Sequence, residues 1–179
     1  MRVIEGKYRG LTITTREGLD TRPTLDNVKE AMFNIIGFKI YDSVVCDVFS
    51  GSGALGIEAL SRGAKKCYFN DVDKEAVKFI KNNLTKLKVS EDYCVSNLSY
   101  DEFLKSLKEK MDIVLLDPPY KKYVYLDILK YLEDNNLLNP FAMFIFECEK
   151  EFKLENVEGY KMKEYKYGKK KLIKLQKLD

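Results

Sequence analysis

The sequence predicts an α/β protein built on a mostly parallel sheet of seven strands, one of which is antiparallel. Between residues 44 and 146, short apolar runs rich in β-forming residues alternate with segments whose apolar residues recur at helical spacing. A glycine turn at residues 51–56 joins the first of these runs to a helix. A final hairpin over residues 157–166 and 171–177, turning at Gly168, supplies the antiparallel strand.

Length and composition indicate a soluble globular protein. Of the 179 residues, 45% are hydrophobic and 33% are charged, and no apolar run is long enough to span a membrane. The N-terminus does not have the pattern of a signal peptide. The four cysteines are scattered, and three of them lie in predicted core strands. We therefore expect buried free thiols in a cytoplasmic protein.

The chain contains no histidine, which excludes nucleophile activation by histidine and every metal site that needs one. Chemistry must then depend on carboxylates, backbone groups, tyrosine or a cofactor, and we expect no metal. The net charge of +3 and the isoelectric point near 8.5 permit a nucleic-acid partner without requiring one. We expect a monomer.

Residues 1–22 are predicted to form a β-hairpin flap outside a single globular domain of residues 23–179. Two short strands, 2–4 and 11–14, flank a turn with basic and aromatic residues. The flap either contacts phosphates through Lys7, Arg9 and Arg22 or is a solvated edge hairpin.

A helix follows over residues 24–36. Thr24 is a good N-cap, apolar residues recur at helical spacing, and Gly37 is a C-terminal stop. Pro23 holds Arg22 in extended geometry. This helix would cover the sheet.

The next unit is typical of a nucleoside-cofactor site. Strand 44–46 leads through Asp47 and Phe49 into Gly51, Gly53 and Gly56, which have G-x-G-x-x-G spacing. A helix follows, and then strand 66–70 ends at Asp71, an acid placed to accept hydrogen bonds from ribose hydroxyls. The unit is Rossmann-like.

Two cofactors fit such a unit. A dinucleotide would place its pyrophosphate at the helix N-terminus, where the negative charge of Asp47 would repel the phosphates. S-adenosylmethionine has no phosphate and is net positive, so acids such as Asp47 favour it. The methyl-donor interpretation is therefore preferred over NAD.

The remaining elements continue the alternation. We predict helices over 76–87, 99–109 and 125–132 and strands over 93–95, 111–116 and 141–146. Asn97 follows strand 93–95, where it could hydrogen-bond an adenine edge, and Asp117 follows strand 111–116. Because ligands bind at the carboxyl ends of parallel strands, Asp47, Asp71, Asn97 and Asp117 should converge on one rim of the sheet.

The rim sequence Asp117-Pro118-Pro119-Tyr120 is the second strong signal. Two prolines stiffen the chain and cannot donate backbone hydrogen bonds. Asp117 and the Pro118 carbonyl can both accept from a planar amine, and Tyr120 can stack on the attached ring. The alternative is a structural Pro-Pro turn.

This combination resembles the amino-group methyltransferases, and the match is specific to one family. Arg22-Pro23-Thr24, the stretch from Phe49 to Ala64, and residues 112–120 are similar to the RsmD family. The family modifies the 2-amino group of the small-subunit ribosomal RNA guanine conventionally numbered 966. The resemblance implies a class I methyltransferase fold and a substrate within an assembled or assembling 30S particle.

The resemblance also implies roles for residues. The cofactor residues correspond to Asp47, the Gly51–Gly56 loop, Asp71 and Asn97, and the catalytic loop to Asp117–Tyr120. The family more often has glutamate where this chain has Asp71, so the ribose contact could be looser.

Lysines and tyrosines interleave in the last hairpin, where Lys169 and Lys170 are candidate RNA contacts. A lysine-lined edge strand that resists aggregation is the structural alternative.

The sequence leaves rivals to consider. A glutamine methyltransferase usually has Asn in place of Asp117 and an extra N-terminal domain, and a DNA adenine methyltransferase needs a recognition insert. An NAD-dependent oxidoreductase is disfavoured by Asp47, and a non-catalytic RNA-binding assembly factor is disfavoured by the intact loop.

Overall fold

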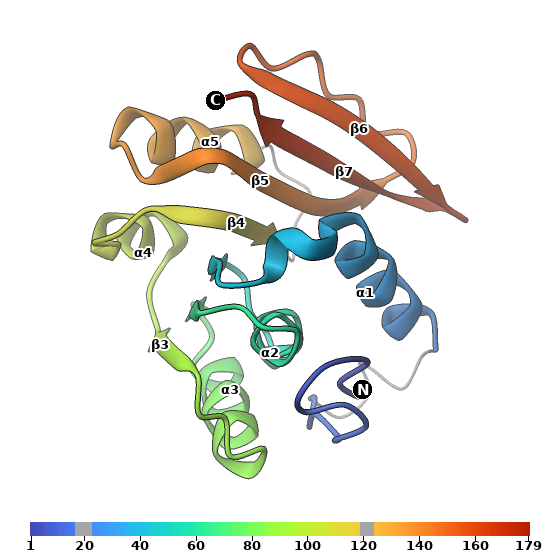
Figure 1. Cartoon of the computed structure of the whole chain (residues 1–179), viewed down its shortest axis with the longest axis vertical. Coiled ribbons are helices and arrows are strands. Elements are labelled where there is room, and N and C mark those ends of the chain that lie inside the picture. The colour runs from blue at the N-terminus through green and yellow to red at the C-terminus, as the bar shows by residue number, and fades with distance from the viewer. Residues whose placement is uncertain (17–22, 119–123) are drawn as a thin grey trace.

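The computed structural model describes residues 1–16, 23–118 and 124–179 and has the predicted architecture. Among these residues, seven strands form one sheet in the order β3-β2-β1-β4-β5-β7-β6, and only β7 runs against the others (Figure 1). The strands are β1 (Val44–Asp47), β2 (Lys66–Asn70), β3 (Asp92–Ser96), β4 (Met111–Leu116), β5 (Leu138–Glu149), β6 (Tyr160–Tyr167) and β7 (Lys170–Lys177).

Helices cover both faces of the sheet (Figure 1). They are α1 (Pro23–Ile36), α2 (Ala54–Ser61), α3 (Lys74–Lys86), α4 (Tyr100–Ser106) and α5 (Val124–Asp134), with a 3-10 turn η1 (Gly37–Ile40) after α1. Buried side chains of α1, α2 and α3 pack on one face and those of α4 and α5 on the other.

Strand β4 shows why the sheet is buried on both sides. Ile113 and Leu115 belong to the core under α1–α3, whereas Val114 and Leu116 belong to the core under α4 and α5. All four are fully buried, as the continuous apolar run predicts for a central parallel strand. None of the described helices is long and apolar enough to cross a membrane.

The N-terminal segment is antiparallel, as predicted, but its only described ladder contact is one bridge between Arg2 and Thr12. The segment does not project as a flap. Val3, Tyr8 and Ile13 are buried in the core under α1–α3, so the aromatic residue of the predicted turn faces the core and not the solvent. Apolar residues spaced along the segment turn inward because α2 offers them a surface to cover.

Two further predictions need correction. Cys94 is exposed because β3 lies at the edge of the sheet, whereas Cys46, Cys67 and Cys148 are buried free thiols. Strand β5 begins at Leu138, three residues earlier than predicted, and its pairing with β4 shifts before Met143.

Candidate active site

The glycine loop after β1 has the geometry that its sequence predicts. Gly51 and Gly53 have φ values of 55° and 83°, in the left-handed region that favours glycine. A Cβ at Gly56 would lie 2.2 Å from the Phe69 ring, so only glycine allows α2 to pack this closely on β2. A Cβ at Gly51 would meet nothing within 4 Å, so the loop presents bare backbone to open space.

Asp47 lies beneath this loop and is completely buried. Its Oδ2 accepts a hydrogen bond from the Gly56 amide at 3.1 Å, and its Oδ1 has no hydrogen-bond partner among the described residues. Burial raises the pKa of Asp47 to about 7, and the charges of Asp117 and Asp71 act in the same direction. A buried carboxyl with an unpaired oxygen is suited to a cationic ligand.

Asp71, at the end of β2, contacts the glycine loop from the opposite side to Asp47. Its Oδ2 accepts from the Gly51 amide at 2.9 Å and its Oδ1 accepts from the Asp73 amide at 2.9 Å. A carboxylate offers about four acceptor sites, so both oxygens can also accept from ribose hydroxyls. The next residue, Val72, is 70% exposed and adds an apolar surface to the rim that the sequence did not suggest.

Asn97 holds the turn that carries Asp71. Its Nδ2 donates to the carbonyl oxygens of Asp71 at 2.9 Å and Val72 at 3.0 Å. The amide nitrogen is therefore directed at the backbone of this turn. The predicted contact of Asn97 with an adenine edge stays a prediction.

The rim depends on two buried polar residues that sequence reasoning missed, Asn70 and Asn83. Asn70 donates to the Val48 and Leu98 carbonyls at 3.3 and 3.0 Å and so ties together the carboxyl ends of β1, β2 and β3. Asn83 bonds the backbone of Thr14 and the Ser52 carbonyl, each at 2.9 Å. Both residues could have been found from the sequence, because each places an amide side chain in an otherwise apolar strand or helix face.

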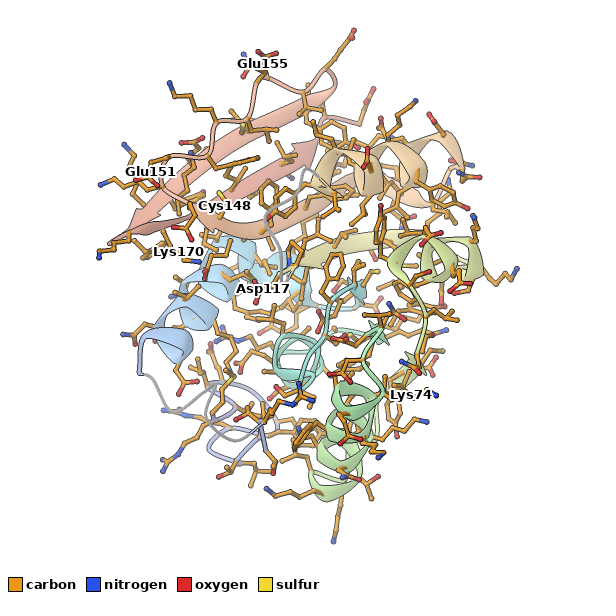
Figure 2. All side chains as sticks on the ribbon, turned by 180° about the vertical axis from the view of Figure 1, so that it is seen from behind. Lys74, Asp117, Cys148, Glu151, Glu155 and Lys170 are labelled. Carbon is orange, nitrogen blue, oxygen red and sulfur yellow. The ribbon has the colours of Figure 1, made fainter. Side chains whose placement is uncertain are left out.

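Asp117, labelled in Figure 2, follows β4 on the same rim. The residue is exposed. Its charge contributes to the raised pKa of both Asp47 and Tyr125, so it is near enough to Asp47 to act on it electrostatically. Pro118 is half-buried. The predicted site residues Pro119, Tyr120 and Arg22 lie outside the described residues.

Phe49 is half-buried beside the glycine loop, with its ring 6.1 Å from that of Tyr100. Both rings pack against the core under α4 and α5. Among the described residues, no group of acids and cysteines could hold a metal ion.

Lys7 and Arg9, two of the predicted N-terminal RNA contacts, do not lie at this rim. Lys7 bonds Glu91 at 2.8 Å and Ser90 at 2.6 Å, next to the amino end of β3 and therefore at the opposite end of the sheet. Arg9 is exposed on the same turn. Arg16, another basic residue of this segment, pairs with Asp73 at 3.3 Å, two residues after Asp71.

Lys169, in the turn between β6 and β7, and Lys170, the first residue of β7, do lie at the rim end. Lys170 is held by two carboxylates, Glu147 and Glu149, each at 3.1 Å, so its charge is largely compensated within the protein. Lys169 is exposed.

Comparison with known proteins decides the family. The family model described as Conserved hypothetical protein 95 matches residues 1–176. A Haemophilus influenzae protein named Ribosomal RNA small subunit methyltransferase D is 41% identical over 165 residues, covering 89% of this chain and 84% of that protein. The Escherichia coli protein of the same name is 34% identical over 157 residues, and the match covers 88% of this chain and 79% of that protein. The chain belongs to the RsmD family.

Solved structures agree with this assignment. The Escherichia coli protein yhhF superimposes on the RsmD-family chain with a TM-score of 0.88 and 30% identity, covering 100% of this chain and 98% of yhhF. A Haemophilus influenzae protein superimposes with a TM-score of 0.82 and 37% identity, and the match covers 99% of this chain and 98% of that protein. Both are provisionally described as methylating enzymes. The fold is that of class I methyltransferases.

Within this fold, the RsmD-family chain brings Asp47, the glycine loop, Asp71, Asn97 and Asp117 to one rim, as the sequence predicted. The buried Asp47, the open glycine turn and Asp71 surround the carboxyl ends of β1 and β2. Asp117 adds an exposed acceptor beside them.

Proposed function

We propose that this chain transfers a methyl group from S-adenosylmethionine to the 2-amino group of the small-subunit ribosomal RNA guanine that the family resemblance implies. The observation that supports this most directly is the convergence of three acids, Asp47, Asp71 and Asp117, on one rim. The relatives named above are ribosomal RNA methyltransferases, which supports RNA as the substrate class. We further propose that the enzyme is a cytoplasmic monomer acting on an assembled or assembling 30S particle.

The residues present fit this methyl donor. The unpaired Oδ1 of Asp47 would receive the donor's ammonium group, and the open backbone at Gly51 allows a close approach. Asp71 would accept from the ribose hydroxyls, and Val72 would pack against the adenine ring. When bound, S-adenosylmethionine supplies an electrophilic methyl group on a sulfonium.

The acceptor side uses Asp117 and Pro118. The guanine amine is a poor nucleophile because its lone pair is conjugated with the ring. Hydrogen bonds from its two N–H groups to the Asp117 carboxylate and the Pro118 carbonyl would draw electron density onto nitrogen and orient its lone pair toward the cofactor site. Methylation releases one N–H proton, which would pass to the Asp117 carboxylate or to water. In-line positioning of this kind can lower a barrier by up to about 7–11 kcal/mol. The guanine must first be extruded from its stack, which costs a few kcal/mol.

Asp71→Ala is expected to weaken S-adenosylmethionine binding, since it removes the ribose acceptors and loosens the Gly51 turn. Isothermal calorimetry measures this directly. Asp71→Glu, which introduces the residue more frequent in the family, should retain most of the affinity. Asp92→Ala removes an exposed acid at the far end of β3 and should change nothing. Unchanged affinity in Asp71→Ala, or binding of NAD by the wild type, would contradict the assignment.

The affinity for S-adenosylmethionine should rise between pH 6 and pH 8. With a pKa of about 7, Asp47 becomes fully ionised only above neutrality, and the ionised form favours a cation. The same shift from 3.8 means that the folded protein holds this proton more tightly than the unfolded chain, so the contribution of Asp47 to stability falls as the pH rises from about 4 to 7.

Calorimetry of wild type and Asp47→Asn across this pH range tests the role of Asp47. The ligand's own ionisation is common to both proteins, so only the difference between their pH profiles reports on Asp47. The variant should have the shallower profile. Identical profiles would show that Asp47 does not face the bound cation.

A further inference from the structure

Tyrosines and lysines of the last hairpin share one face of the sheet. On β6, Tyr167, Tyr165, Lys163 and Lys161 alternate onto the face of the sheet that α1 covers, and Lys174 of β7 pairs with Lys163 in register. Tyr165 and Leu172, also paired, belong to the core under α1–α3, which fixes the face. We call these five residues, Tyr167, Tyr165, Lys163, Lys161 and Lys174, the tyrosine–lysine strip.

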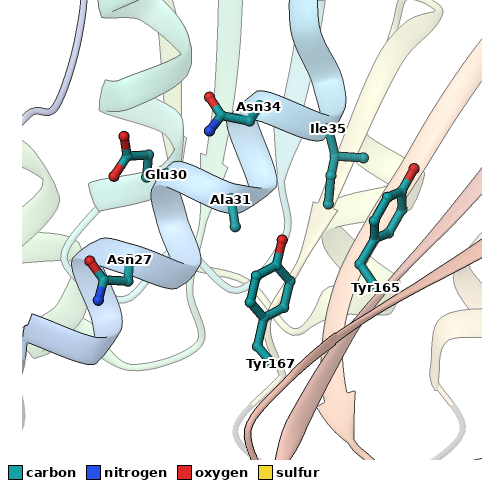
Figure 3. Close-up of a pocket in the computed structure, with 7 residues that line it drawn as sticks. All are labelled: Asn27, Glu30, Ala31, Asn34, Ile35, Tyr165 and Tyr167. Carbon is teal, nitrogen blue, oxygen red and sulfur yellow. The ribbon is translucent and has the colours of Figure 1, made fainter.

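The strip borders a hollow between β6 and α1 (Figure 3). The hollow has a volume of about 610 Å³ and is lined by Asn27, Glu30, Ala31, Asn34, Ile35, Tyr165 and Tyr167. Both tyrosine rings extend from the strand toward the helix in Figure 3, and Tyr167 is 38% exposed. Two partly open rings facing asparagine amides make a site for flat polar groups such as nucleobases.

The lysines of the strip differ from their neighbours in how their charge is compensated. Lys170 is bonded to Glu147 and Glu149, and Lys171 is buried against Glu164 at 3.0 Å. By contrast, the described residues provide no carboxylate in ion-pair contact with Lys161, Lys163 or Lys174.

The like charges of the strip act on one another. The pKa of Lys174 is lowered by burial and by the charges of Lys163 and Lys161. Burial also lowers the pKa of Lys39, in the 3-10 turn η1 after α1, and the charge of Lys174 adds to that effect against the opposing influence of Asp112. Such a cluster costs folding free energy unless an anion neutralises it. Glu30 is the acid that lines the hollow, on the α1 side.

The strip leads away from the active-site rim. Lys170 pairs with Glu149 at the carboxyl end of β5, and Tyr167 pairs with Lys170, so the tyrosine end lies at the rim end of the sheet. From Tyr167 to Lys161 the strand advances about 20 Å, at about 3.3 Å per residue. The strip therefore runs from the rim toward the opposite end of the sheet.

We propose that the tyrosine–lysine strip binds the single-stranded RNA that adjoins the target guanine, with unpaired bases against Tyr167 and Tyr165 and phosphates on Lys163, Lys161 and Lys174. The proposal rests on the proposed function, because it assumes an RNA substrate at the rim. Charge complementarity selects the occupant, since a cluster of lysines that are not neutralised within the protein suits a polyanion. The proposed RNA contact therefore lies on these lysines and not on Lys170, whose charge is already compensated by Glu147 and Glu149.

The test compares two double variants with equal loss of charge. Lys161→Gln with Lys163→Gln removes two lysines of the strip, and Lys105→Gln with Lys108→Gln removes two exposed lysines in and after α4, on the other face of the sheet. Binding is measured on deproteinised small-subunit ribosomal RNA and on undermethylated small subunits, over a range of salt concentrations. The strip variant should bind about tenfold more weakly with a shallower salt dependence, and the control should behave as wild type.

Two aromatic variants complete the experiment. Tyr167→Ala should weaken binding by roughly tenfold and Tyr167→Phe should not, because stacking needs the ring and not the hydroxyl. Methyl-donor affinity and the urea midpoint should be unchanged in all variants. Equal effects of the two double variants, or a loss seen only on particles and not on deproteinised RNA, would overturn the proposal. If wild type failed to methylate small subunits, the proposed function itself would fail, which is a distinguishable result.

Discussion

Replacing Asp117 with alanine is expected to abolish methyl transfer while leaving the affinity for S-adenosylmethionine close to that of the wild type. Asp117 is exposed at the end of β4, and its carboxylate is proposed to accept a hydrogen bond from the substrate amine rather than from the methyl donor. Removing one preorganised hydrogen-bond partner from a reacting group typically costs about 10²–10³ in turnover. We expect a loss of at least that size, since the same residue both activates and orients the nitrogen.

The measurement pairs methyl transfer rates with calorimetric methyl-donor affinity. Asp127→Ala is the matched control, because Asp127 is an exposed acid in the first turn of α5, ten residues farther along the chain, and should leave both quantities unchanged. An Asp117→Ala protein with ordinary turnover would refute the catalytic role. Parallel loss of turnover and methyl-donor affinity would instead place Asp117 in the cofactor site.

The second large effect is a loss of stability on replacing Glu58, whose side chain binds the backbone of the N-terminal segment to α2. The side chain is fully buried in α2. Its oxygens accept from the amides of Ile4 at 2.9 Å and Glu5 at 3.0 Å, and they pair with Lys29 at 3.2 Å and Arg62 at 2.8 Å. Lys29 is only 2% exposed, and burial lowers its pKa.

Glu58→Ala is expected to lower the free energy of unfolding by about 3–5 kcal/mol, because it leaves a buried lysine and two amides without their partner. Urea denaturation measures the change. Glu5→Ala is the matched control, since Glu5 also pairs with Arg62 at 2.8 Å but is 64% exposed, and its loss should cost about 1 kcal/mol or less. Equal destabilisation by the two variants would contradict the anchoring role of Glu58.

The parts of the fold that depend on local pattern were predictable from the sequence. The order of strands and helices follows from apolar periodicity, and the rim follows because the carboxyl ends of parallel strands share one edge. Gly56 is a clear case, since the motif required glycine and the structure supplies the reason in the Phe69 ring.

The parts that depend on distant pairing were not predictable. Lys7 appeared to be a free cation, but it pairs with Glu91, 84 residues away. Tyr8 appeared to be an exposed tip, but its hydroxyl bonds Glu91 and accepts from the Ser90 amide at 3.1 Å. Nothing in the local sequence distinguishes a lysine with a distant carboxylate partner from one without, which is also why Lys170 and Lys163 looked alike.

The most direct test of the proposed function is transfer of a labelled methyl group from S-adenosylmethionine to undermethylated small ribosomal subunits, followed by nucleoside analysis. We expect wild type to label N2-methylguanosine in small-subunit RNA, large subunits to stay unlabelled, and Asp117→Ala to give no label. Label recovered in adenosine or in protein glutamine, or no transfer to small subunits at all, would contradict the proposed function.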